Sequence, residues 1–250
     1  MPRVSAYHRP SSLEEALALL ERDGAHVLGG GSDLVGRLNT GELGDIEVVD
    51  LQSLGLSSIV SDAAGRVRLG AMASLQAVAD TESLPGALRD LARAEEPSTL
   101  RGRATIGGVV AGRDPESVLL AGLLAADASV VLADASGERT VALATVLAEG
   151  VGRGVITAVV VATDGTWATS ATRRTPADVP IVAVVGRRRP DCSVARAVTG
   201  VAATPIVMDA EAADPASGLE PSADFRGSAD YRRHLAAVHL ARVLDALASN

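Results

Sequence analysis

The chain has 250 residues, of which 47% are hydrophobic, and it carries a formal net charge of −8 at pH 7. This length can bury the core of one large domain or of two to three small ones. The acidic balance and the scarcity of aromatic residues (one Trp, two Tyr, one Phe) argue against a nucleic-acid or anionic-membrane partner. No apolar run reaches the roughly 18 residues of a membrane span. The first residues lack the apolar core of a signal peptide, so we expect a cytoplasmic protein.

Metal chemistry has little support in the residue types. Cys192 is the only cysteine, which excludes an internal disulfide, an iron–sulfur cluster ligated by this chain and a cysteine-based zinc site. The four histidines show no metal-ligand spacing. We expect no metal site, and we expect Arg187–Arg189 to form the solvated end of a strand.

The first third of the chain has the pattern of a small β/α unit. Apolar residues between Leu13 and Leu20 recur at helical spacing, and Ser12 with Glu15 has the spacing of a capping box. Gly24 is placed to end that helix. The predicted elements are a helix over 13–20, a strand over 25–28, a short helix capped by Ser32 and a strand over 46–49. We expect this unit to span residues 1–57.

A second α+β unit is expected over residues 58–162. The predicted elements are a strand over 67–69, a helix capped by Ser74, a helix over 84–94, a hairpin of 129–132 with 139–143 around Ser136-Gly137, and a β-branched strand over 155–162. The stretch 95–113 is predicted to be a loop. Asp114 and Pro115 have the residue types of an N-cap and a first helical position, so they predict a helix from there to about Ala126.

The last third, residues 163–250, is expected to form a separate α+β unit with a small antiparallel sheet and helices. Strands are predicted over 166–172 and 181–185, a polar loop over 212–228 and a terminal helix over 229–248. No internal repeat is present, and candidate ligand-binding segments occur only in the first two units.

Two glycine clusters are the strongest candidates for a ligand site. The first is Gly29-Gly30-Gly31-Ser32-Asp33-Leu34, and the second is Thr105-Ile106-Gly107-Gly108. Each borders an apolar segment and is followed by residues that can open a helix. Glycine allows positive φ and close approach of a ligand, and consecutive backbone N–H groups can bind an anion. Two such clusters suit a ligand with two phosphates, although each can also be an ordinary turn.

The chain resembles a known family in several motifs along nearly its whole length. These are Leu13-Glu14-Glu15-Ala16, the first glycine cluster, Val49-Asp50-Leu51, Leu69-Gly70-Ala71, the segment from Arg101 to Gly108, Thr199-Gly200-Val201-Ala202-Ala203-Thr204-Pro205 and Ala229-Asp230-Tyr231-Arg232-Arg233-His234-Leu235. In these motifs it is similar to the FAD-binding medium subunit of molybdenum-containing hydroxylases, the xanthine dehydrogenase and carbon monoxide dehydrogenase family.

The resemblance implies a fold, a cofactor and partners. The fold would be α+β: a two-lobed FAD-binding domain of the type shared with vanillyl-alcohol-oxidase-like flavoproteins, followed by the C-terminal α+β domain. FAD would lie between the lobes, and partner iron–sulfur and molybdopterin subunits would supply electrons that the flavin passes to a small-molecule acceptor. The cofactor-binding residues implied are Leu28, Gly29, Gly30, Gly31, Ser32, Asp33, Leu34, Thr105, Ile106, Gly107, Gly108, Asp114 and Ser117.

Two positions depart from the family pattern. Val109 stands where the family usually has Asn or Ser, and Val118 stands where an Asp usually follows Ser117. An apolar side chain cannot replace the hydrogen bonds of those residues. Two hypotheses therefore remain. The first is an FAD-binding oxidoreductase, either a subunit that receives electrons from a partner or a free-standing flavoprotein that takes them from a small-molecule substrate. The second is a cofactor-poor member of the same fold that serves as a binding or structural module.

Overall fold

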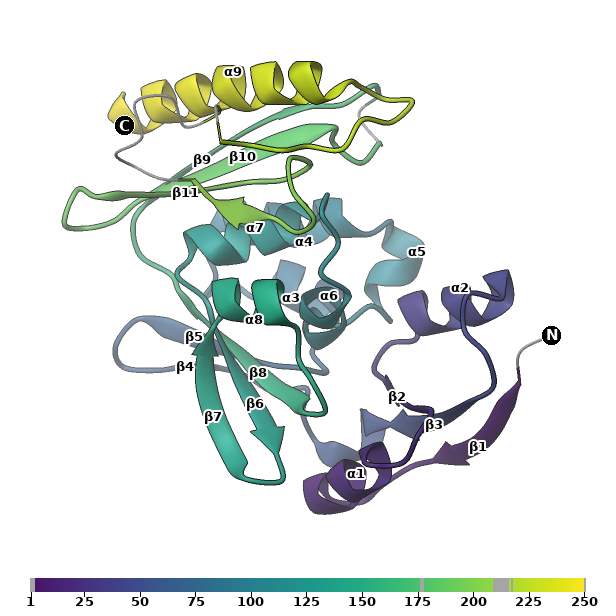
Figure 1. Cartoon of the computed structure of the whole chain (residues 1–250). Helices are drawn as coiled ribbons and strands as arrows, with labels where there is room; N and C mark the ends of the chain where they lie inside the picture. The colour runs from purple at the N-terminus through teal and green to yellow at the C-terminus, as the bar shows by residue number, and fades with distance from the viewer. Residues whose placement is uncertain (1–2, 176–177, 209–215, 217, 250) are drawn as a thin grey trace.

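The computed structural model describes residues 3–175, 178–208, 216 and 218–249. Three β-sheets, built from successive stretches of chain, organise it (Figure 1). The first is parallel, in the order β1-β3-β2. Its strands are β1 (Val4–His8), β2 (Ala25–Leu28) and β3 (Ile46–Asp50), and its helices are α1 (Leu13–Leu20) and α2 (Ser32–Thr40). A 3-10 turn, η1 (Leu51–Leu54), follows β3.

The helix α1 forms as its capping pattern predicts. The Ser12 hydroxyl accepts a hydrogen bond from the Glu15 backbone N–H, and the Glu15 carboxylate accepts one from the Ser11 N–H. Gly24, after the helix, has φ +78°. The buried Ala16 then packs with Val49 of β3 and with Val155 of a strand in the second sheet. The first sheet with α1 and α2 is called the first lobe below, and the second sheet with its helices is called the second lobe. The two lobes meet at this small core.

The second sheet is antiparallel, in the order β4-β5-β8-β6-β7. Its strands are β4 (Ile59–Ser61), β5 (Arg66–Gly70), β6 (Ser129–Asp134), β7 (Gly137–Ala142) and β8 (Val155–Ala162). Its helices are α3 (Leu75–Asp80), α4 (Gly86–Glu95), α5 (Ser98–Arg101), α6 (Ile106–Gly112), α7 (Val118–Ala125) and α8 (Leu143–Glu149). The predicted hairpin and the β-branched strand are both present.

The third sheet is antiparallel, in the order β12-β11-β10-β9, and lies between helices (Figure 1). Its strands are β9 (Thr166–Thr172), β10 (Val182–Arg188), β11 (Val194–Val198) and β12 (Ile206–Val207), and α9 (Ala229–Ala248) covers one face. The other face contacts α7. Ala183, Val185 and Ala197 belong to the same apolar cluster as the buried helix α7. The C-terminal sheet thus shares its core with the second lobe.

The structure corrects several element predictions near the glycine clusters. The N-cap of α2 is Gly31, and Ser32 is the first helical residue. The expected loop 95–113 contains two helices, α5 and α6, and the second glycine cluster lies inside α6. The helix predicted from Asp114 begins at Val118 with Ser117 as its cap, because Asp114 instead accepts the Glu116 N–H in a tight turn.

Other elements were not predicted from the sequence. They are β1, β4, β11, β12 and α8. Arg187 is not solvated as expected: it is buried and pairs with Asp127 and Asp164. The predicted loop 212–228 lies partly outside the described residues.

Candidate functional site

A cleft of about 1270 Å³ opens between the first and second lobes. Both glycine clusters contribute to its lining, and Arg226, just before α9, reaches it from the C-terminal part. Cavities for drug-sized ligands measure roughly 300–1,000 Å³. This cleft therefore has room for a ligand of dinucleotide size.

The first-lobe wall of the cleft presents the N-terminus of α2. Its N-cap Gly31 has φ +78° and offers no side chain to cap the helix. The first N–H groups of an α-helix have no partner within the helix, and the helix dipole adds partial positive charge there. Ser32 and Asp33, in this first turn, line the cleft. This wall is suited to bind an anion through backbone groups.

The glycines of the first cluster also let the two lobes approach. A Cβ on Gly30 would overlap the carbonyl oxygen of Arg103, and one on Gly29 would lie 3.0 Å from the Thr105 hydroxyl oxygen. Any side chain at Gly30 would separate the segments. The first cluster is therefore needed for contact between the lobes as well as for the cap of α2.

The second glycine cluster forms the start of α6 on the facing wall. The Thr105 hydroxyl accepts a hydrogen bond from the Gly108 N–H at 3.1 Å, so this helix N-terminus is already capped. A Cβ on Gly107 would lie 2.8 Å from Ala71; this glycine serves packing inside the lobe. Gly108 is exposed and lines the cleft. Its N–H already donates to the Thr105 hydroxyl. Gly108 therefore contributes no free donor to the cleft, and its lack of a side chain leaves room for a ligand.

Acidic side chains gather on the second-lobe wall. Glu95, Glu96, Asp114 and Glu116 all line the cleft. The Glu116 carboxylate pairs with Arg226, which is the basic residue that reaches this part of the cleft from the C-terminal region. Burial and the charge of Asp114 raise the pKa of Glu96.

Glu95 is a partly buried member of this group whose carboxyl is held by a neighbouring helix. Its Oε2 accepts a hydrogen bond from the backbone N–H of Leu119 at 3.0 Å. Burial raises the pKa of Glu95 to about 7, a shift that the Ser117 hydroxyl and the Leu119 N–H oppose and that the charges of Asp114 and Glu96 increase. Glu95 is not among the site residues predicted from the sequence. A usable signal was present, because two acidic residues at a helix C-terminus oppose the helix dipole and need a local reason.

Most residues implied by the resemblance line this one cleft. Those that do are Gly29, Gly30, Gly31, Ser32, Asp33, Leu34, Thr105, Gly107, Gly108 and Asp114. Three lie behind its surface. Leu28 packs on a separate apolar cluster of Leu34, Ile46 and Val48, Ile106 is fully buried, and Ser117 is buried, where its hydroxyl caps α7. The three are positioned to support the walls.

The two departures from the family pattern differ in place. Val109 lines the cleft. Val118 is buried at 3% exposure within the main apolar cluster. A polar side chain at 118 would therefore have to leave the core to reach a ligand.

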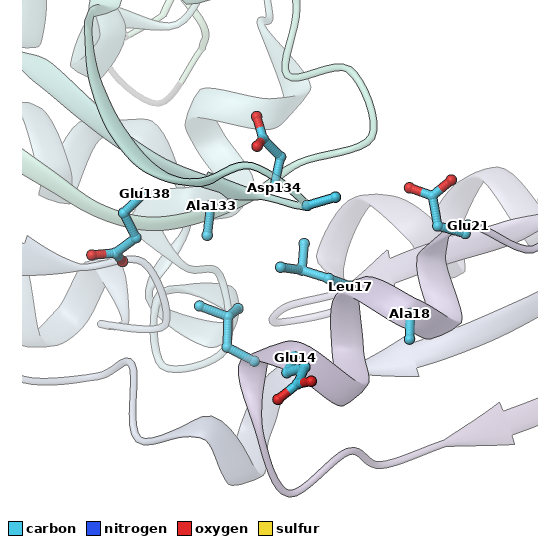
Figure 2. A pocket seen from close by; sticks show the side chains of 10 residues that line it. Glu14, Leu17, Ala18, Glu21, Ala133, Asp134 and Glu138 are labelled. Carbon is cyan, nitrogen blue, oxygen red and sulfur yellow. The ribbon is translucent and has the colours of Figure 1, made fainter.

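A smaller pocket of about 520 Å³ lies between α1 and the β6–β7 hairpin (Figure 2). Its floor includes Leu17 and Ala133. Three of its carboxylates are already engaged: Glu21 with Arg153, Asp134 with Arg139, and Glu138 with the Thr157 hydroxyl. Within the described part of the chain, no group of three or more His, Cys, Asp or Glu could hold a metal ion. The interlobe cleft is thus the better candidate site.

The residues of the cleft fit FAD. The start of α2 has glycine at the N-cap position and no side-chain cap, so it offers N–H groups to a pyrophosphate. The glycines leave the approach open, and the acidic wall offers acceptors to hydroxyl or N–H groups. The fold and the cleft thus define a protein with room for a dinucleotide-like ligand between its first two lobes.

Comparison with known proteins identifies the class. The sequence family described as the FAD-binding domain in molybdopterin dehydrogenase matches residues 3–161. The chain is 32% identical to the uncharacterized protein YgfM of Escherichia coli K12, over 95% of this chain and 94% of that protein. It is 27% identical to the carbon monoxide dehydrogenase medium chain of Afipia carboxidovorans, over 98% and 97% of the two chains.

Solved structures agree. A carbon monoxide dehydrogenase of Hydrogenophaga pseudoflava matches with a TM-score of 0.87 and 25% identity, over 100% of this chain and 99% of that one. The chain therefore belongs to the family of FAD-binding domains of molybdopterin dehydrogenases. The resemblance, the flavin cofactor and the oxidoreductase class predicted from the sequence are confirmed. The comparisons do not favour the cofactor-poor alternative.

Proposed function

We propose that the cleft holds FAD with its pyrophosphate at the N-terminus of α2. The observation that carries this proposal is the glycine-capped start of α2, which faces a cleft of dinucleotide size and has no side-chain cap. The adenylate half would lie along the first lobe, and the flavin half along the second. When bound, the flavin supplies the redox chemistry, and the protein contributes binding and orientation.

We further propose that the chain is the medium subunit of a molybdenum hydroxylase complex. Its relative in Afipia carboxidovorans is a medium chain of carbon monoxide dehydrogenase. Iron–sulfur and molybdopterin subunits would then supply electrons, which a small-molecule acceptor would remove.

We also propose a finer assignment of the fold. It is a two-lobed domain of the vanillyl-alcohol-oxidase type followed by a C-terminal domain, with units at 1–57, 58–162 and 163–250. We propose a cytoplasmic location as well. The described chain has no helix long and apolar enough to cross a membrane.

Flavin content tests the first proposal. Purified protein is expected to absorb in the visible range and to release FAD on denaturation. The protein stripped of flavin should bind FAD more tightly than FMN, and ADP should compete with FAD, because both carry the pyrophosphate that α2 would bind. Binding that does not distinguish FAD from FMN would contradict this placement, and absence of FAD binding would contradict the proposal itself.

Native purification tests the complex. The chain has a mass of 25.3 kDa and is expected to elute from its own cells in a larger assembly that contains molybdenum and iron. Elution as a chain of that mass without these metals would contradict a role as a medium subunit.

A further inference from the structure

Glu95 joins two helices at the wall of the cleft. It is the last residue of α4, and its carboxylate reaches the first turn of α7, where Oε2 accepts the Leu119 N–H at 3.0 Å. All eight residues of α7 are buried. The carboxylate therefore caps a buried helix while its residue also lines the cleft.

Capping alone does not account for a carboxylate at this position. A neutral side chain could accept the Leu119 N–H, and Ser117 already caps the same helix through the Leu120 N–H at 3.0 Å. An ionised carboxylate has about four acceptor sites on two oxygens. The Leu119 N–H and the Ser117 hydroxyl use part of this capacity. The two oxygens therefore keep unused acceptor capacity in a residue that lines the cleft.

The surroundings of Glu95 make the ionised form costly without a further donor. Asp114 and Glu96 lie close enough to disfavour its charge. The arginines that line the cleft have other partners: Arg226 pairs with Glu116 and Asp224, Arg113 donates to the Leu147 carbonyl, and Arg37 pairs with Glu42. Arg101 donates to the Glu96 carbonyl and to the Gln76 side chain. A ligand that donates a hydrogen bond to Glu95 would reduce the free-energy cost of its ionised form.

We propose that Glu95 is a cofactor-binding residue, whose carboxylate accepts a hydrogen bond from a ribityl hydroxyl or ring N–H of the flavin half of FAD. The inference rests on the proposed FAD site. It assigns the anion-binding wall to the pyrophosphate and the acidic wall to the donors of the ligand. The proposed site places the adenylate half along the first lobe, so a contact with Glu95 on the second-lobe wall falls on the flavin half.

FAD binding should depend on pH if the ligand donates a hydrogen bond to Glu95. Because the pKa of Glu95 is raised to about 7, part of the free protein carries the neutral carboxyl near neutral pH. A donor from the ligand favours the ionised form, so FAD binding should release a proton. FAD affinity is therefore expected to increase as the pH rises from about 6 to about 8.

The test uses Glu95→Gln in the full chain, with FAD affinity measured by quenching of flavin fluorescence. The Gln side chain retains an oxygen that can accept the Leu119 N–H, so the fold should persist; the melting temperature without flavin checks this. At about pH 8 we expect FAD to bind about tenfold more weakly or worse, because a hydrogen bond to a charged group is lost. The variant should also lose the dependence on pH.

Two control variants separate Glu95 from other titrating groups of the cleft. Glu96→Gln removes the neighbouring carboxyl, and His26→Asn removes the histidine that lines the cleft. Both should retain the increase in affinity with pH. If either abolishes it while Glu95→Gln retains it, the assignment to Glu95 is wrong.

Fragments of the cofactor locate the contact. Glu95→Gln should weaken FMN binding and leave ADP binding unchanged, because only FMN carries the flavin half. Weakening of ADP alone would overturn the assignment to the flavin half. Unchanged FAD affinity and pH dependence in a folded variant would overturn the proposal while leaving the FAD site intact. Failure of the wild-type protein to bind FAD would instead overturn the proposed function, and this inference with it.

Discussion

The two walls of the cleft differ in what they offer a ligand. The first-lobe wall offers backbone N–H groups at the glycine-capped start of α2. On the second-lobe wall, the start of α6 is already capped by Thr105, and the polar groups are largely carboxylates such as Glu95 and Asp114. The two glycine clusters thus have different structural roles. In the first cluster the glycines leave the start of α2 without a side-chain cap, where we propose that an anion binds. In the second they permit packing inside the lobe and leave an open surface on the cleft.

The largest effect on unfolding free energy is expected for Gly30→Ala. The new Cβ would overlap the Arg103 carbonyl, so the lobes must separate, at a cost of about 3 kcal/mol or more. Gly36→Ala is the matched control, because it lies in α2 with nothing within 4 Å. The control should stabilise the protein by roughly 0.5–1 kcal/mol. Urea unfolding of both measures this, and equal effects would show that the walls do not depend on close approach.

The next effect concerns the charge of the second wall. In the folded protein without flavin, the pKa of Glu95 is about 7, against an ordinary 4.5. Between these values the folded state binds more protons than the unfolded state, so stability decreases as the pH rises through this window. Glu95→Gln removes this loss and should stabilise the protein by about 1–3 kcal/mol at pH 8 relative to its effect at pH 4. The same difference from wild type at both pH values would contradict a costly buried charge.

A smaller loss is expected for Gly31→Ala on the first wall. Gly31 has φ +78°, and an alanine in that conformation costs about 1–2 kcal/mol. The cap of α2 should shift, and FAD affinity should decrease with it. Gly31→Asn is the control, since Asn tolerates this conformation better. If both variants unfold and bind FAD alike, the conformation of the cap has no role in the anion site.

The smallest effect on stability is expected for Gly108→Val. Gly108 does not have a positive φ, and a Cβ would meet only the Thr105 hydroxyl oxygen, at 3.1 Å. The unfolding free energy should change by less than about 1 kcal/mol. FAD binding should nevertheless be lost, because the side chain would project from the cleft wall. Gly102→Val, outside the cleft and with nothing within 4 Å, should bind FAD normally; normal binding by Gly108→Val would remove α6 from the site.

The sequence alone determined the elements that depend on local patterns. The Ser12 cap and helical spacing predict α1, and the turn at Ser136-Gly137 predicts the β6–β7 hairpin, because these signals act between neighbours in the chain. The family resemblance predicted a set of cofactor-binding residues, and most of that set line one cleft. Exposed edge strands such as β1 were not predicted, because an element with few buried residues has no apolar pattern in its sequence.

Only the tertiary structure decided the character of the second wall. Adjacent glycines indicate a loop, but burial of Ile106 and Val110 and the Thr105 cap make the segment helical. Likewise, nothing local predicts that Glu95 meets Leu119, 24 positions away. Packing of α4 against α7 brings them together, and the resulting burial sets the protonation of Glu95. Such long-range contacts depend on how several elements fill one core, which a residue pattern within one element does not contain.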